Sequence, residues 1–227
     1  FVENIKVISD SGAKIIIIHD YTNLVSSTLK LFNIDQKIIQ DWQVADHKTT
    51  QIIEMVLSGY INKRIVSFLA QAGCKSVGIS GKDGYLIESR KSFIARKHSD
   101  ELIDIGFLGE PIEVNCDILN NFIDSDIVTV ISPVSFGLNG ATYILDADIT
   151  AAVIACEIMA KHLIFLTSLG SISVNGQELR TCSLNKLRQL MQQNLIQIGY
   201  EKIINAARRA LENNTKFVYI GNAASYD

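Results

Sequence analysis

The 227-residue chain has little of several features that define common classes of protein. It has two prolines, so no proline-rich linker separates domains. Its formal net charge is −3, whereas a nucleic-acid-binding domain usually carries a basic face. No apolar run approaches the ~18 residues of a membrane-spanning helix, and no signal peptide is evident at the start. We therefore expect neither a nucleic-acid partner nor a membrane partner.

Cysteine is also scarce and widely spaced. The four cysteines are Cys74, Cys116, Cys156 and Cys182, and none forms a C-x-x-C pair. Isolated cysteines of this kind are typical of reduced thiols in a cytoplasmic protein. We therefore expect a cytoplasmic location and no disulfide framework.

The general phosphate and metal motifs are missing. Gly73 and Gly78 have the glycine spacing of a P-loop, but Ile79 stands where its lysine would be, and there is no G-x-G-x-x-G. The four histidines show no metal-ligand spacing. The residues by themselves therefore predict no protein-bound metal and no P-loop.

What is present is one long helical pattern followed by a strand. Apolar residues recur at helical spacing from Thr49 to Ala72, and Gly73 stands where a helix usually ends. Ser76–Ile79 then reads as a short buried strand, with Ser80–Gly84 as the loop at its carboxyl end. The helix has apolar residues on more than one side, so we expect it to pair with its counterpart in a homodimer.

Strand and helix patterns alternate along the rest of the chain. This alternation predicts an α/β three-layer sandwich with a largely parallel central sheet. The expected strands are Ala13–His19, Gly106–Val114, Ile127–Ser132, His162–Thr167 and Lys216–Ile220. The expected helices are Asn23–Phe32, Cys116–Asp124, Ile149–Lys161, Ser183–Gln193 and Tyr200–Asn213. Ligands of such sheets bind at the carboxyl ends of the strands.

Several segments resemble those of acetylglutamate kinases, which are members of the amino-acid kinase family. They are Glu54–Leu69 followed by Gly78–Gly84, Asp104–Glu110, Ala141–Ala152 and Leu163–Thr167. The resemblance implies a carbamate kinase-like fold over a single domain, 1–227. It also implies an N-terminal acceptor and dimer lobe (about 1–145) and a C-terminal nucleotide lobe (about 146–227). The implied reaction is ATP-dependent phosphorylation of the γ-carboxylate of N-acetyl-glutamate in arginine biosynthesis.

The resemblance also implies site residues in the nucleotide lobe. Asp148 matches the aspartate that orients the family's catalytic lysines, although an aspartate that caps the following helix explains it equally well. In the family, a C-terminal glycine loop and a nearby lysine hold the nucleotide phosphates. Gly199 belongs to the matching loop here, which we call the second glycine loop, and Lys202 is the lysine that remains in it. Thr167 and Ser168 stand beside the implied nucleotide.

The acceptor lobe departs from the family pattern at several implied substrate-binding positions. Asp20, Tyr21 and Thr22 replace three glycines that follow His19. Gln43 replaces an arginine, and Ile144 replaces an asparagine two residues before Asp146. A glutamine cannot form the charge-assisted bidentate contact that an arginine makes with a carboxylate.

The second glycine loop also departs from the family pattern. Ile198 replaces a glycine there, and the family's lysine position falls on Ile203, one residue after Lys202.

Two functions remain open. The chain is either an acetylglutamate kinase-type enzyme that uses Mg-ATP, or a non-catalytic relative that acts as a regulatory or partner subunit, paired with itself or with an active paralogue. In the second case we expect no cofactor. Because the substitutions affect several sub-sites, we favour impaired or lost activity.

Overall fold

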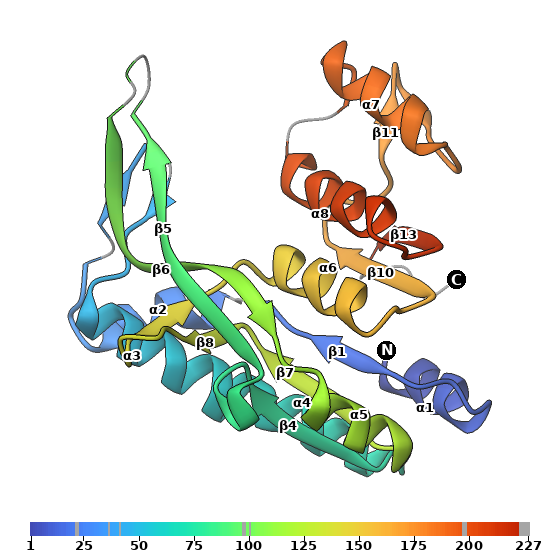
Figure 1. Ribbon diagram of the computed structural model, residues 1–227, viewed down its shortest axis with the longest axis horizontal. Helices are drawn as coiled ribbons and strands as arrows, with labels where there is room; N and C mark the ends of the chain where they lie inside the picture. Colours follow the sequence, from blue (N-terminus) through green and yellow to red (C-terminus); the bar gives the residue numbers. More distant parts are fainter. Residues whose placement is uncertain are drawn as a thin grey trace. The chain divides into compact units, whose positions relative to one another are not determined.

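The computed structural model describes residues 1–20, 23–35, 37–40, 42–96, 99, 101–196 and 199–222, without the side chains of Asn23 and Trp42. The chain divides into two compact units, Phe1–Ala147 and Asp148–Asp227. The boundary lies two residues after the one expected from the sequence. Each unit has its own core, and Figure 1 shows the elements of both units.

The first unit contains a three-stranded parallel sheet in the order β1 (Ile16–Ile18), β7 (Val128–Ser132) and β4 (Ser76–Ser80). Val128 and Val130 of β7 pack with Leu69 and Cys74, and apolar residues of helix α1 (Val2–Asp10) join this cluster. Helix α5 (Asp117–Asp124) packs against β7. The parallel pairing confirms the predicted α/β class.

The predicted long helix is confirmed, with a difference in its middle. It consists of α3 (His47–Glu54), a π-helical segment η1 (Met55–Ile61) and α4 (Asn62–Gln71). Asp46 caps its start by accepting a hydrogen bond from the Thr49 backbone N–H at 2.8 Å. Gly73, with a φ of +80°, follows its end as predicted. Apolar spacing alone does not distinguish one π-helical turn from an α-helical one.

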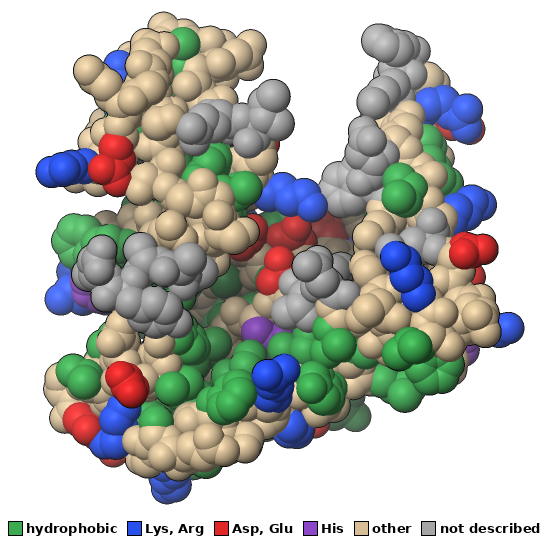
Figure 2. All heavy atoms as spheres, turned by 180° about the vertical axis from the view of Figure 1, so that it is seen from behind, with side chains coloured by type: hydrophobic (Ala, Val, Ile, Leu, Met, Phe, Trp, Pro, Cys, Tyr) green, Lys and Arg blue, Asp and Glu red, His purple; other side chains and the backbone are tan. Residues whose placement is uncertain are grey.

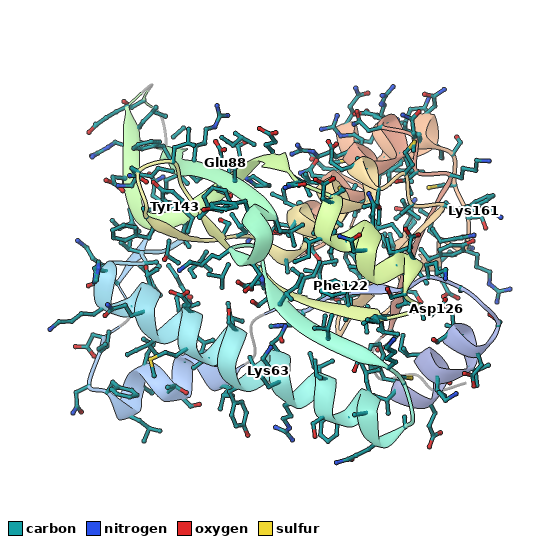
Figure 3. All side chains as sticks on the ribbon, turned by 60° about the horizontal axis from the view of Figure 1, so that its bottom comes forward. Lys63, Glu88, Phe122, Asp126, Tyr143 and Lys161 are labelled. Atoms are coloured by element: carbon teal, nitrogen blue, oxygen red, sulfur yellow. The ribbon has the colours of Figure 1, made fainter. Side chains whose placement is uncertain are left out.

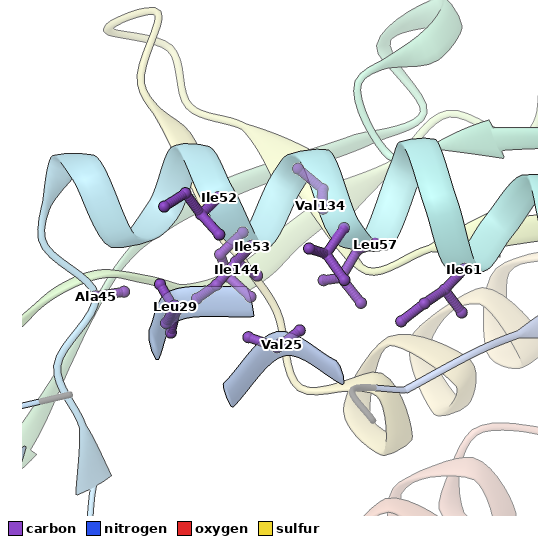
Figure 4. Packing of buried hydrophobic residues seen from close by; sticks show 10 residues of the cluster. Val25, Leu29, Ala45, Ile52, Ile53, Leu57, Ile61, Val134 and Ile144 are labelled. Atoms are coloured by element: carbon purple, nitrogen blue, oxygen red, sulfur yellow. The ribbon is translucent and has the colours of Figure 1, made fainter. Parts of the chain in front are cut away.

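One side of this helix forms the main core of the first unit. Ile52, Ile53, Leu57 and Ile61 point toward helix α2 (Asn23–Leu31), as Figure 4 shows. Val134 and Ile144, which lie on two strands packed against the helix, complete the cluster. This packing fixes the helix against the elements that carry the candidate acceptor positions.

A small barrel lies beside this core. It is formed by β5 (Ile87–Ala95), β6 (Leu102–Val114), β9 (Thr142–Ile144) and β8 (Val134–Phe136), and η2 (Asp83–Tyr85) precedes it. Figure 3 shows Glu88 and Tyr143 in this region and Lys63 on α4. Strand β6 begins four residues before the expected Gly106, because its first part pairs with the far end of β5 in a projecting hairpin arm.

A second hairpin contacts this arm. It is formed by β2 (Ile38–Ile39) and β3 (Trp42–Gln43), which pair antiparallel. Gln40, at its turn, donates a hydrogen bond from Nε2 to the Ala95 carbonyl at 2.9 Å. The arm and the hairpin that carries Gln43 are therefore linked.

The second unit is built on two parallel strands, β10 (His162–Thr167) and β13 (Phe217–Asn222). Helices α6 (Ala147–Glu157) and α8 (Glu201–Glu212) bury Leu163 and Phe165 on one face of this pair. The remaining elements are β11 (Ser173–Val174), β12 (Gln177–Glu178) and α7 (Leu184–Gln192). Leu187 and Met191 of α7 pack with Ile172 and Tyr200.

Two surface properties bear on the expected partners. On the face shown in Figure 2, lysine and arginine side chains are scattered rather than gathered in one continuous strip. Among the described residues, no helix combines the length and apolar character needed to cross a bilayer.

Candidate functional site

The carboxyl ends of the three parallel strands of the first unit meet at one edge. Ile18 pairs with Ile131, and Ser80 pairs with Ser132, so His19 follows β1 beside these two serines. This is the edge at which α/β sheets bind ligands. The structure therefore brings the His19 segment to the place where the sequence predicts the acceptor site.

Asn62 connects this edge to the long helix. Its side-chain amide is fully buried and donates to the carbonyl oxygens of Ile79 at 3.2 Å and Val130 at 3.0 Å. The same nitrogen lies 3.5 Å from Nε2 of His19. Lys63, the next residue, donates to the Gly78 carbonyl at 2.5 Å. These contacts fix the helix relative to strands β4 and β7.

His19 is buried at the edge of the sheet. Desolvation lowers the pKa of its imidazole to about 4, and a hydrogen bond with the Asp20 backbone opposes this shift. The side chain is therefore neutral at physiological pH. Its Nδ1 is buried, and no residue that the structure describes forms a hydrogen bond with it.

The substrate-binding positions implied for the acceptor lobe have different surroundings. Asp20 and Gln43 are exposed, and Asp146 is half-buried. Ile144 is 1% exposed and belongs to the main core, so it offers apolar contact only. Tyr21 and Thr22 lie outside the described residues.

The second unit brings its own candidate residues to one edge. Helices α6 and α8 each precede a strand of the parallel pair and run opposite to it (Figure 1). The starts of both helices therefore lie at the same edge as the carboxyl ends of the strands. Asp148 lies in the first turn of α6, Thr167 ends β10, and Lys202 lies in the first turn of α8.

Asp148 does not precede its helix, as a capping residue would. Helix α6 begins at Ala147, two residues before the expected Ile149. An aspartate inside the first turn still interacts favourably with the positive end of the helix dipole. The expected cap at Asp148 is therefore replaced by an interaction with the helix dipole, and its role in orienting lysines stays a prediction.

A carboxylate occupies the start of α8. The backbone N–H of Gly199 donates to Oε2 of Glu201 at 2.8 Å. Backbone N–H groups at the start of a helix are the donors that bind phosphate in many nucleotide sites. Here Glu201, the first residue of α8, accepts the backbone N–H of Gly199, which lies in the loop directly before the helix.

The neighbouring loop is linked to this turn. The hydroxyl group of Tyr200 donates to the Gly170 carbonyl at 2.8 Å, and the Tyr200 side chain is buried. The hydroxyl of Thr167 accepts a hydrogen bond from the Leu169 backbone N–H at 3.2 Å, and Ser168 is exposed. The loop after β10 and the start of α8 therefore form one connected surface.

The position at which the resemblance implies a lysine, Ile203, is apolar and buried. Ile203 is 7% exposed and packs with alanines of α6 and with Phe165. Lys202, one residue earlier, is exposed and has interactions of its own. Ile198 lies outside the described residues.

Sequence reasoning missed the role of Glu201. The available signal was an acidic residue in the first turn of a helix that follows a glycine, because such a residue commonly accepts hydrogen bonds from the free N–H groups there. It also missed the contact of Lys82 with Glu54, at 2.8 Å, because the two residues lie on separate elements.

Comparison with known proteins identifies the family. The Amino acid kinase family model matches residues 1–222. The chain is 32% identical to the acetylglutamate kinase of Syntrophus aciditrophicus over 97% of this chain and 76% of that protein. It is 34% identical to the acetylglutamate kinase of Archaeoglobus fulgidus over 92% of this chain and 74% of that protein.

Solved structures show the same fold. The crystal structure of smu.665 from Streptococcus mutans aligns with a TM-score of 0.84 at 18% identity and covers 99% of this chain and 89% of that one. Carbamate kinase from Giardia aligns with a TM-score of 0.71 at 13% identity and covers 97% of this chain and 82% of that one. The chain belongs to the amino acid kinase family and has its α/β sandwich fold. Within that family it is similar to acetylglutamate kinases.

Proposed function

We propose that this chain is an acetylglutamate kinase-like protein of arginine biosynthesis in which phosphoryl transfer is lost or strongly reduced. It acts in the cytoplasm as a non-catalytic partner subunit, assembled with itself or with an active paralogue. Loss of transfer requires that the site no longer stabilises the negative charge of the moving phosphoryl group.

The hydrogen bond from Gly199 to Glu201 carries this proposal. A triphosphate at the glycine loop before α8 would compete with the Glu201 carboxylate for the Gly199 N–H and would be repelled by its charge. The family's lysine position contributes no positive charge, because Ile203 is in the core. The residues present therefore do not fit Mg-ATP in the way the family resemblance implies.

The acceptor lobe supports the same proposal. Gln43 is exposed on its hairpin but carries no charge to pair with a substrate carboxylate. Ile144 is enclosed in the core and presents no polar group. An N-acetyl-glutamate molecule therefore loses contacts at both positions.

The long helix supplies the proposed assembly surface. Met55, Tyr60 and Phe68 are 61%, 54% and 43% exposed. The guanidinium group of Arg64 lies 5.9 Å from the Tyr60 ring and 5.4 Å from the Phe68 ring. A second copy of this helix would cover these apolar side chains, which a monomer leaves in water.

One arrangement favours the alternative, an active acetylglutamate kinase-type enzyme. Asp148, Thr167 and Lys202 reach the same edge of the parallel pair. In that case these residues bind and orient Mg-ATP, and the bound metal–nucleotide supplies the phosphoryl group. The two proposals differ in whether the nucleotide binds.

The test combines a binding measurement with a product assay. The purified protein is titrated with Mg-ATP in a calorimeter and then assayed for acyl phosphate with N-acetyl-glutamate. We expect neither micromolar binding nor detectable product. Micromolar binding with turnover that is lost in Asp148→Asn would overturn the proposal and establish the enzyme.

A further inference from the structure

A pocket in the first unit lies apart from the candidate sites. It has a volume of about 200 Å³ and lies between helix α3, strand β6 and the turn that joins β8 to β9. Its lining residues are His47, Thr50, Gln51, Glu54, Phe107, Gly140, Ala141 and Thr142. None of the acceptor positions lines it. Pockets for drug-sized ligands have volumes of roughly 300–1,000 Å³, so this one suits a smaller molecule.

One ion pair borders the pocket: Glu54 lines it, and its partner Lys82 lies beside the lining residues. Nζ of Lys82 lies 2.8 Å from Oε1 of Glu54 and 3.0 Å from Oγ1 of Thr142, so it joins the helix to the β8–β9 turn. The loop that carries Lys82 is itself held, because Ser80 donates from both its backbone N–H and its hydroxyl to the Asp83 carboxylate at 2.7 Å. The charged pair is therefore positioned before any ligand arrives.

Most other polar groups of the lining are already used. The hydroxyl of Thr50 donates to the Asp46 carbonyl at 2.7 Å. The backbone N–H groups of Gly140 and Ala141 donate to the Gly137 carbonyl at 2.8 Å and the Asn139 side chain at 3.1 Å. By contrast, the side chains of His47 and Gln51 make no hydrogen bond to any residue that the structure describes. These two groups are available to a ligand.

The charges of the pocket select the class of ligand. Glu54, in the lining, and Lys82, at the border of the pocket, are opposite charges within hydrogen-bond distance and both are partly exposed, so the charge of Glu54 is balanced. A zwitterion can align its own ammonium and carboxylate head to tail with such a pair. The ring of Phe107 and the methyl group of Ala141 offer an apolar surface to a side chain. We propose that this pocket binds a free α-amino acid.

In this arrangement the ammonium group of the ligand meets the Glu54 carboxylate and its carboxylate meets Lys82. Gln51 and His47 meet polar atoms further along the ligand. N-acetyl-glutamate does not satisfy this site, because acetylation removes the ammonium group. Amino-acid binding at this pocket is therefore independent of whether the chain transfers a phosphoryl group.

The test is calorimetric titration of the protein with a panel of the twenty common L-amino acids. N-acetyl-L-glutamate and glycerol serve as probes without an ammonium group. We expect at least one amino acid to bind and the two probes not to bind at this pocket. Gln51→Trp fills the pocket from an exposed helix position, and we expect it to weaken binding at least tenfold. Gln71→Trp places the same side chain at an exposed position later in the same helix and should leave binding unchanged.

A second variant tests the charged pair. Glu54→Gln keeps the size of the side chain but removes the acceptor charge for an ammonium group, so we expect at least tenfold weaker binding. Three results would overturn the proposal: no amino acid binds at millimolar concentration, a bound amino acid binds equally well to Gln51→Trp, or glycerol competes with it.

Discussion

Asn62 occupies the space that any side chain at position 78 would need. A Cβ atom placed on Gly78 would lie 1.9 Å from Oδ1 of Asn62 and 2.9 Å from a methyl carbon of Val66. Asn62 is fully buried and held by two backbone carbonyls, so it cannot move aside without losing those hydrogen bonds. The contact between helix α4 and strand β4 therefore depends on glycine at this position.

Gly78→Ala should lower the free energy of unfolding by about 2–3 kcal/mol, because the added methyl group overpacks a buried polar contact. Chemical denaturation measures the change. Gly59→Ala is the matched control: a Cβ there meets nothing within 4 Å in its own chain, so at concentrations where the protein is monomeric it should be neutral or stabilising. Equal stability of the two variants would contradict the assigned role of Asn62.

The buried imidazole predicts a pH dependence. The pKa of His19 is about 4 in the folded protein against 6.5 for an unperturbed histidine, so the unfolded chain takes up the proton first as the pH falls. His19 should therefore lower the free energy of unfolding between pH 6.5 and pH 4, by roughly 3 kcal/mol at the lower limit.

The measurement compares urea unfolding of the parent with that of His19→Gln across this range. The carboxylates titrate in both proteins, so the difference between the two curves isolates His19. A difference that does not change with pH would show that His19 titrates normally in the folded state.

Gly59→Val tests the proposed homodimer. Gly59 lies on the π-helical segment and borders open space in its own chain. A branched side chain there would hold two copies of the helix apart while leaving the monomer fold intact. We expect at least tenfold weaker dimerisation by analytical ultracentrifugation, with a smaller effect for Gly59→Ala. Unchanged assembly of both variants, or a monomeric parent at micromolar concentration, would exclude this surface.

Ile203→Lys should not restore a nucleotide site. The side chain would place an ammonium group among the alanines of α6 and α8, so we expect a loss of about 3 kcal/mol or more in the free energy of unfolding. Asn205→Lys introduces the same residue at an exposed position of the same helix and should change stability by less than about 0.5 kcal/mol. If Ile203→Lys instead folds with parental stability and binds Mg-ATP, the lysine position is accessible after all.

The sequence predicted the elements whose signals are local. The long helix, its glycine terminus and the buried strand Val128–Ser132 follow from apolar spacing and lie close to the expected bounds. The π-helical turn did not follow, because its register depends on packing against Val25 and Leu29. Packing of this kind is a tertiary effect that spacing does not encode.

The candidate site was less predictable than the fold. The motif resemblance located Asp148 and Lys202, but it could not show that Glu201 accepts the Gly199 N–H. It also could not show that Ile144 and Ile203 face cores. Which side of an element faces a core depends on what packs against it, and single residues at the end of a motif carry no periodic signal.

The hairpin formed by β2 and β3 has a practical consequence. Its second strand contains Trp42, directly before Gln43, and the chain has one tryptophan. Indole fluorescence of the unlabelled protein therefore arises from this hairpin alone. A ligand that binds at the carboxyl ends of β1, β7 and β4 and moves the hairpin will change this emission. A ligand that binds elsewhere and leaves the hairpin in place will not. The protein thus carries its own optical reporter one residue before Gln43, where the resemblance to acetylglutamate kinases implies a substrate-binding arginine.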